Sequence, residues 1–270
     1  MKFFTNAELR YQVNGPGTLI LNLHALRNSH QTIISETISI EPYHKAEEIF
    51  EVAGENRLIR LKLTQAGPFN IRYQAVVDNT YVVKDPPDLL ETPVDELSPD
   101  ILPMLYPSRY CQSDKLGRLA GHLFGHLGNA YEKVRAIVDW IYAIVEYRSG
   151  FSNVETSAYD TVTQQAGVCR DFAHLGIALF RALSIPARYF TAYAYLLVPQ
   201  DFHACFEAYL GGEWVLFDAT KLVPINGLIK IATGRDAADA SIANIFGDIR
   251  FNRMAVSCNL GDADFVPLYQ

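Results

Sequence analysis

Apolar and polar residues alternate along much of the first third of the chain. Four segments there favour apolar or β-branched residues, and several follow the period of two that is typical of strands. These segments are 18–26, 32–40, 57–63 and 69–77. Turn-forming residues separate them, among them Asn14-Gly15-Pro16-Gly17 and Ala66-Gly67-Pro68. The pattern predicts an antiparallel, β-sandwich-like N-terminal domain over residues 1–84.

A different composition follows in residues 85–107, which are rich in proline and carry an acidic cluster. Because proline lacks a backbone donor and resists regular structure, this stretch is predicted to be a connector between two domains.

Beyond the connector, helical and strand-like patterns alternate. Apolar residues in 131–145 recur at the helical spacing of three and four, and so do those from Phe172 to Leu183. Strand-like runs follow at 188–194, 203–210 and 213–220. Residues 108–270 are therefore predicted to form an α+β core with a C-terminal extension.

Charge and hydropathy narrow the class of protein. The chain has 270 residues, a net charge of -7, a pI near 5.5 and a mean hydropathy of +0.03. No cluster of Lys and Arg is present, so a nucleic-acid partner is not expected. The first residues lack the apolar core of a signal peptide, and no run approaches the ~20 apolar residues of a membrane span. We therefore expect a cytoplasmic protein without a membrane partner; its oligomeric state is not legible from the sequence.

The cysteines argue against a structural metal site. The chain has Cys111, Cys169, Cys205 and Cys258, and no two of them form a Cys-x-x-Cys pair. This distribution fits neither a disulfide framework nor a zinc ribbon, so reduced thiols are expected. An acidic loop with calcium-ligand spacing is also not evident in the sequence. We expect no cofactor and no metal ion.

Cys169 stands out because it follows Gly167-Val168 and precedes an apolar, helix-patterned run. It would then lie in the first turn of a helix, where free N–H groups and the helix dipole stabilise a thiolate. Such a thiol is a candidate nucleophile, although free cysteines are more often small buried hydrophobes.

A hairpin supplies possible partners for Cys169. If Gly211-Gly212 is a two-residue loop, Cys205 lies opposite Asp218, and His203 becomes a diagonal neighbour of Asp218 on the same sheet face. An imidazole and a carboxylate at that separation can share a hydrogen bond. Together with Cys169 they would provide a nucleophile, a base and an orienting group.

Alternative assignments remain for the neighbouring residues. Glu207 shares the predicted face of His203 and is a rival orienting group, whereas Cys205, in mid-strand, is interpreted as packing. An oxyanion would need the backbone N–H of the nucleophile and a second donor, for which Gln164 or Gln165 is a candidate. Polar residues ahead of a helix are, however, common without such a role.

Several separated blocks, in the right order, resemble the bacterial transglutaminase-like superfamily of putative cysteine proteases. They are Gly167-Val168-Cys169-Arg170-Asp171-Phe172-Ala173-His174, Ile185-Pro186-Ala187-Arg188-Tyr189, Asp201-Phe202-His203-Ala204 and Trp214-Val215-Leu216-Phe217-Asp218-Ala219-Thr220. The strand-rich first part is similar to the N-terminal region of such proteins. Residues 231–239 resemble a motif near the end of such proteins.

The resemblance implies a papain-like α+β core and a Cys169–His203–Asp218 triad that transfers an acyl group through a thioester. Two positions depart from the family, Cys205 where tryptophan is frequent and Ala219 where proline is frequent. The favoured function is a thiol peptidase or amidohydrolase acting on a peptide or protein amide. A transglutaminase or amide ligase that uses an amine acceptor is an alternative. An inactive scaffold that binds a peptide or partner is another.

Overall fold

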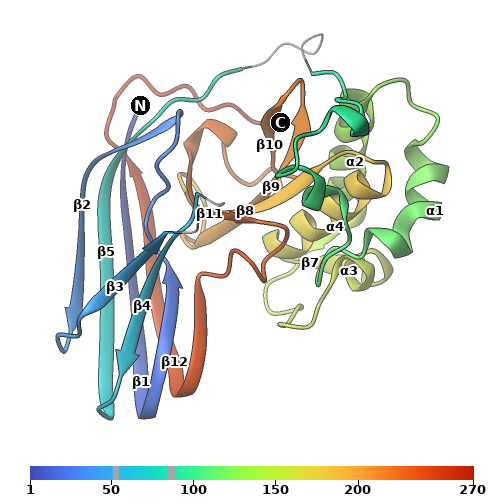
Figure 1. Ribbon diagram of the computed structural model, residues 1–270. Coiled ribbons are helices and arrows are strands. Elements are labelled where there is room, and N and C mark those ends of the chain that lie inside the picture. The colour runs from blue at the N-terminus through green and yellow to red at the C-terminus, as the bar shows by residue number, and fades with distance from the viewer. Residues whose placement is uncertain (51–54, 84–88) are drawn as a thin grey trace.

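A computed structural model describes residues 1–50, 55–83 and 89–270 of the chain (Figure 1). The start of the predicted connector, residues 85–88, lies outside the described residues. A large curled antiparallel sheet occupies one side of the molecule, and a smaller sheet covered by helices occupies the other. The α+β class predicted from the sequence is confirmed.

The larger sheet is built around one long strand, β1 (Lys2–Asn22). Along one edge β1 pairs first with β5 (Gly67–Asn79) and then with β4 (Arg57–Leu63). The outer strands are β2 (Gln31–Glu41) beside β5 and β3 (Ala46–Phe50) beside β4. Buried and more exposed residues alternate along β1, β4 and β5, so one face of this part of the sheet forms the core.

The turn predicted at Asn14-Gly15-Pro16-Gly17 is wrong, because β1 runs through these residues. The pairing register with the neighbouring strand shifts between Val13 and Gly17, so the turn-forming residues make a local irregularity instead. A Cβ on Gly17 would lie 2.7 Å from the Phe246 carbonyl oxygen, which explains the need for glycine there. Strand pairing on both edges overrides the local turn preference.

The other edge of β1 is covered by β12 (Ala243–Leu260), which comes from the end of the chain. The two strands pair from Phe3 with Leu260 to Leu21 with Ala243. The sequence pattern did not indicate β12, and its pairing brings a late segment into the N-terminal sheet. The division of the chain at residues 84 and 107 stays a prediction.

The smaller sheet has the strand order β10-β9-β8-β11. These strands are β8 (Ala187–Ala194), β9 (Phe202–Leu210), β10 (Glu213–Phe217) and β11 (Leu228–Gly234). The helices are α1 (Ser113–Phe124), α2 (Ala130–Ile144), α3 (Ala158–Gln164) and α4 (Cys169–Ala182). Helix α4 packs directly on β9, where a Cβ on Gly176 would lie 2.5 Å from the Phe206 ring. This close approach places the N-terminus of α4 near the sheet.

Short elements complete the chain. Within the described ranges, 3-10 turns lie at Val94–Glu96, Leu102–Leu105 and Ile225–Gly227, and two short strands, β6 (Glu146–Tyr147) and β7 (Ala166–Gly167), pair in parallel. Helix α2 confirms the helix predicted over 131–145, whereas α1 was not predicted. None of the helices within the described ranges is long and apolar enough to cross a membrane.

Candidate active site

Cys169 is the first residue of helix α4, as the sequence predicted. The Asp171 carboxylate accepts a hydrogen bond of 2.8 Å from the Val168 N–H, which caps the helix start. Gly167 makes this cap possible, since a Cβ there would lie 2.7 Å from the Asp171 Cβ. The conspicuous Gly-Val-Cys-Arg-Asp sequence therefore builds a tight helix entry that leaves the Cys169 side chain partly exposed.

His203 and Asp218 meet as the hairpin argument predicted. Leu210 pairs with Glu213 across the Gly211-Gly212 loop, and the register continues without a shift to the last pair of β9 and β10. The Nε2–H of His203 donates a hydrogen bond of 2.9 Å to the Asp218 carboxylate. Because a carboxylate only accepts, this bond places the proton on Nε2 and leaves Nδ1 free.

Asp218 is itself held in place by several donors. Its other carboxylate oxygen accepts hydrogen bonds from the Thr220 N–H at 2.9 Å and from the Thr220 hydroxyl at 2.7 Å. Its own N–H donates to the Gln270 side-chain carbonyl at 3.0 Å. Both His203 and Asp218 are almost completely buried. Such anchoring fixes the direction of the carboxylate toward the imidazole.

The surroundings of His203 favour its protonated form. Burial lowers the pKa of His203, but Cys205, Asp218 and the Cys169 thiol outweigh it and raise that pKa well above its usual value. Burial raises the pKa of Cys205 to about 12, so Cys205 is a neutral thiol near pH 7. The Asp218 carboxylate is therefore the main cause of the upward shift. The Cys169 thiol lies near the same ring.

Tyr147 was missed by the sequence analysis. In the pairing of the short strands β6 and β7, Tyr147 lies opposite Gly167, which precedes Cys169 by two residues. The Tyr147 ring packs on the Phe172 ring, with the two ring centroids 5.9 Å apart. The phenol lies close to Cys169, and its partial burial raises the pKa of Tyr147 to about 12. A neutral hydroxyl at this position can donate to an oxygen beside Cys169. The two-residue parallel pairing that positions it has no periodic sequence signal.

The other candidates lie in different surroundings. Gln164 ends helix α3 and Gln165 follows it, with both side chains exposed and neither bonded to Cys169 in the described structure. The side chain of Glu207 is bound by Arg188 and Lys230, which leaves Asp218 as the partner of His203. Cys205 is fully buried beside His203.

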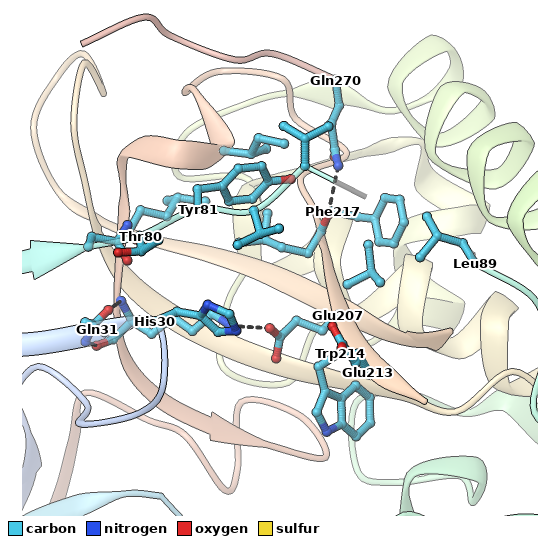
Figure 2. A pocket seen from close by; sticks show the side chains of 18 of the residues that line it. His30, Gln31, Thr80, Tyr81, Leu89, Glu207, Glu213, Trp214, Phe217 and Gln270 are labelled. Carbon is cyan, nitrogen blue, oxygen red and sulfur yellow. Dashed lines mark hydrogen bonds and ion pairs between the residues drawn. The ribbon is translucent and has the colours of Figure 1, made fainter. Parts of the chain in front are cut away.

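A separate cavity of about 240 Å³ lies where the two sheets meet (Figure 2). Its lining comes from the end of β5, from β9 and β10, and from the C-terminal residue, and includes Tyr81, Glu207, Trp214 and Gln270. None of Cys169, His203 and Asp218 lines it. The cavity and the thiol–imidazole cluster are therefore distinct features of the core.

Two family models match the chain. The bacterial transglutaminase N-terminal domain matches residues 1–100, and the transglutaminase-like superfamily core matches residues 118–219, a range that contains the cysteine, histidine and aspartate. A crystal structure of a putative cysteine protease from Cytophaga hutchinsonii is 56% identical, with a TM-score of 0.97, and the match covers 100% of this chain and 94% of that one. The chain belongs to the transglutaminase-like superfamily. The first match contains β1 to β5 of the curled sheet, and the second contains helices α2 to α4 and strands β8 to β10.

Curated relatives extend the match to mycobacteria. Uncharacterized protein ML0607 of Mycobacterium leprae is 29% identical over 147 residues, which are 51% of this chain and 52% of that protein. Uncharacterized protein Rv2569c of Mycobacterium tuberculosis is 37% identical over 62 residues, or 23% of this chain and 20% of that protein. The match therefore spans about half or less of the length of these relatives.

Proposed function

We propose that this protein is a thiol peptidase or amidohydrolase that transfers an acyl group from an amide to Cys169 and then to water. Membership of the transglutaminase-like superfamily supports cysteine-dependent amide chemistry in general. The observation that carries the proposal is the buried hydrogen bond from the His203 imidazole to the Asp218 carboxylate, with the free Nδ1 of the same ring near the Cys169 thiol at the start of α4. The similarity to a putative cysteine protease favours hydrolysis.

The proposed reaction begins at the Cys169 sulfur. His203 accepts the thiol proton, and the thiolate attacks the amide carbonyl carbon to form a C–S bond and a tetrahedral oxyanion. As the oxyanion collapses, the C–N bond breaks and the His203 imidazolium gives its proton to the departing amine. Asp218 keeps the proton on Nε2, so that Nδ1 performs both transfers. Water, deprotonated by His203, then attacks the thioester and releases the carboxylic acid and the thiol.

Two donors converge beside the sulfur to stabilise the oxyanion. The Cys169 N–H belongs to the first turn of α4, where backbone donors have no partner within the helix. The Tyr147 side chain, on the short strand beside Gly167, lies close to Cys169 and carries a neutral hydroxyl that can donate. When a carbonyl oxygen enters, it would take both the N–H and the phenolic O–H as donors. We infer that Tyr147, rather than Gln164 or Gln165, is the second donor.

The proposed substrate is a peptide or protein amide. With an amine in place of water, the same thioester would give a transglutaminase or ligase, because the acceptor is selected by access and dryness of the site. An inactive binding scaffold would need no contact between the thiol and the imidazole. The absence of a nucleic-acid or membrane partner and the cytoplasmic location stay predictions.

Alkylation kinetics test the proposed nucleophile. Iodoacetamide labelling followed by mass spectrometry near pH 7 should modify Cys169 faster than Cys111 or Cys258, which are buried. A His203→Gln substitution should slow labelling of Cys169 and leave the other two sites unchanged. Equal rates at all three cysteines, together with no effect of the substitution, would contradict a catalytic role for the thiol.

The choice of acceptor needs a separate assay. A glutamine-containing peptide is supplied with and without a labelled primary amine, and both ammonia release and incorporation of the label are measured. Hydrolysis should exceed incorporation at equal conversion. Incorporation above hydrolysis would replace the peptidase proposal with a transglutaminase, and neither product from a panel of amides would favour the binding scaffold.

A further inference from the structure

Residues 261–270, which we call the strap, cross from the larger sheet to the smaller one and end beside β10 (Figure 1). At the start of the strap, the Lys2 N–H of β1 donates a hydrogen bond of 2.7 Å to the Asp262 carboxylate. The Phe265 ring then packs edge-on against Phe3 of the same strand, with the ring centroids 5.7 Å apart. The strap is therefore anchored on the larger sheet.

The second half of the strap is fixed beside the smaller sheet. The Asn226 side-chain amide donates to the Val266 carbonyl oxygen at 2.8 Å and accepts from the Leu268 N–H at 3.0 Å. The Leu268 carbonyl oxygen accepts a hydrogen bond of 2.8 Å from the Ile225 N–H. The Leu268 side chain packs against the buried apolar cluster that contains Leu216 of β10. These contacts bring the end of the strap to β10.

The Gln270 side chain binds β10 on the edge that faces away from β9. In the described structure β10 is an outer strand of the smaller sheet. The Gln270 Nε2–H donates to the Leu216 carbonyl oxygen at 2.8 Å, and Oε1 accepts from the Asp218 N–H at 3.0 Å. A carbonyl and the N–H two residues later face the same side of a strand, where an antiparallel neighbour would bind both. One side-chain amide therefore takes the place of a neighbouring strand.

This amide supports the residue that orients the imidazole. Thr220 holds the Asp218 carboxylate, whereas Gln270 holds the Asp218 main chain. Asp218 is only 1% exposed, so its N–H would be costly to leave without a partner, and the main chain would move to find one. Such a movement would lengthen the 2.9 Å hydrogen bond between Asp218 and His203.

We propose that Gln270 is a positioning residue for the Asp218 carboxylate, and that the strap thereby connects the larger sheet to the reacting groups. The role in catalysis rests on the proposed function, because the position of Asp218 affects turnover only if His203 transfers protons. Gln270 acts through Asp218 and contacts no reacting atom. The larger sheet then contributes to the geometry of the reaction without supplying the nucleophile, the base or the orienting carboxylate.

Gln270→Met tests the amide, because methionine is close to glutamine in length and neither side chain is charged. With both hydrogen bonds lost, kcat should fall by about 10- to 100-fold with little change in KM. The pKa of His203, followed by NMR, should also fall, since Asp218 would lie farther from the ring. Because the substitution removes no charge, a lower pKa of His203 would report movement of Asp218.

Two further variants accompany this test. Gln12→Met makes the same change in β1, where the Gln12 amide donates to the Val13 carbonyl oxygen, and should leave kcat and the pKa of His203 unchanged. Asn226→Ala weakens the attachment of the strap and keeps the Gln270 amide, so both quantities should fall by less than in Gln270→Met. Asn226→Ala also replaces Gln270→Met if the latter does not fold, as judged by circular dichroism.

The positioning role and the proposed function fail differently in these experiments. A folded Gln270→Met that is less stable but keeps the kcat and the His203 pKa of the unaltered chain would overturn the positioning role and leave the peptidase proposal intact. The same result for Asn226→Ala would overturn it where Gln270→Met does not fold. If the unaltered chain cleaves no amide, a lower pKa of His203 in Gln270→Met would still support the positioning of Asp218, while the peptidase proposal would be lost.

Discussion

Strand β9 contributes to two buried ionic clusters on the same face, one around Glu207 and one around His203 and Asp218. The two clusters differ in the partner that each carboxylate binds. At one end, Glu207 is bound by Arg188 at 2.6 Å and by Lys230. At the other end, Asp218 is bound by His203 at 2.9 Å. Both carboxylates have almost no exposed surface. Glu207 and Lys230 line the cavity in Figure 2, and the His203 cluster lies near Cys169.

The Glu207 carboxylate binds an arginine and a lysine, whereas the Asp218 carboxylate binds a histidine. Burial works against the charged form of Glu207, but Lys230 and Arg188 outweigh it and lower the pKa of this carboxyl. Lysine and arginine keep their charge near neutral pH, so this cluster has no group that titrates there. Histidine can gain and lose a proton, and His203 has a free nitrogen beside a thiol. Burial of charge alone therefore does not identify a reactive site.

Removal of the proposed nucleophile, Cys169, should abolish activity and leave the fold intact. In Cys169→Ala we expect activity to fall by more than about a thousandfold, because no thioester can form. The free energy of unfolding should change by less than about 1 kcal/mol, since the side chain is partly exposed. Turnover and urea unfolding measure the two effects. Cys258→Ala is the control for activity, and turnover retained by Cys169→Ala would remove this residue from the mechanism.

Removal of the orienting carboxylate should have the next largest effect. Asp218→Asn should lower kcat by roughly 100- to 10,000-fold, because an amide that donates to Nε2 shifts the proton to Nδ1. It should also lower the pKa of His203, since the main negative charge beside the ring is lost.

The pKa of His203 can be followed by NMR in both proteins. Because its folded pKa is raised, His203 protonation contributes stability that is complete below about pH 6.5 and is lost as the pH rises through the folded pKa. Asp218→Asn should reduce this pH dependence. Asp139→Asn, at an exposed ion pair with Lys221, is the matched control. An unchanged titration of His203 would contradict the orienting role.

A substitution in the Glu207 cluster should lower stability and leave activity unchanged. Glu207→Gln leaves two cations without their buried carboxylate and should reduce the free energy of unfolding by about 3 kcal/mol. The variant that remains folded should keep its kcat. Glu47→Gln, at an exposed pair with Arg60, should change the free energy of unfolding by less than about 1 kcal/mol. A large fall in kcat for folded Glu207→Gln would erase the distinction between the clusters.

The smallest expected effect concerns the oxyanion. Tyr147→Phe removes one donor and retains the ring that packs on Phe172, so kcat should fall by about 10- to 100-fold with little change in KM. Steady-state kinetics measure the split, and Tyr159→Phe, at an exposed tyrosine, is the control. A change confined to KM would assign Tyr147 to substrate binding instead.

The β9–β10 hairpin and the start of α4 could be predicted because each is determined by a few neighbouring residues. The two-residue glycine loop determines the register of β9 and β10, and that register brings His203 to Asp218. The glycine before Val168 and the apolar spacing after Cys169 likewise indicated the start of α4. In contrast, the turn predicted near Pro16 was wrong, because strands from distant parts of the chain pair on both sides of β1.

The sequence by itself determined the position of Cys169 at a helix start and of His203 and Asp218 on one sheet face, since helix caps, side-chain periods and tight turns act over a few residues. Only the tertiary structure decided which groups surround them. It brought Tyr147 beside Cys169, paired Glu207 with Lys230, and left a second thiol beside the imidazole. These contacts join residues that the chain separates widely, and no local pattern records the packing that brings them together.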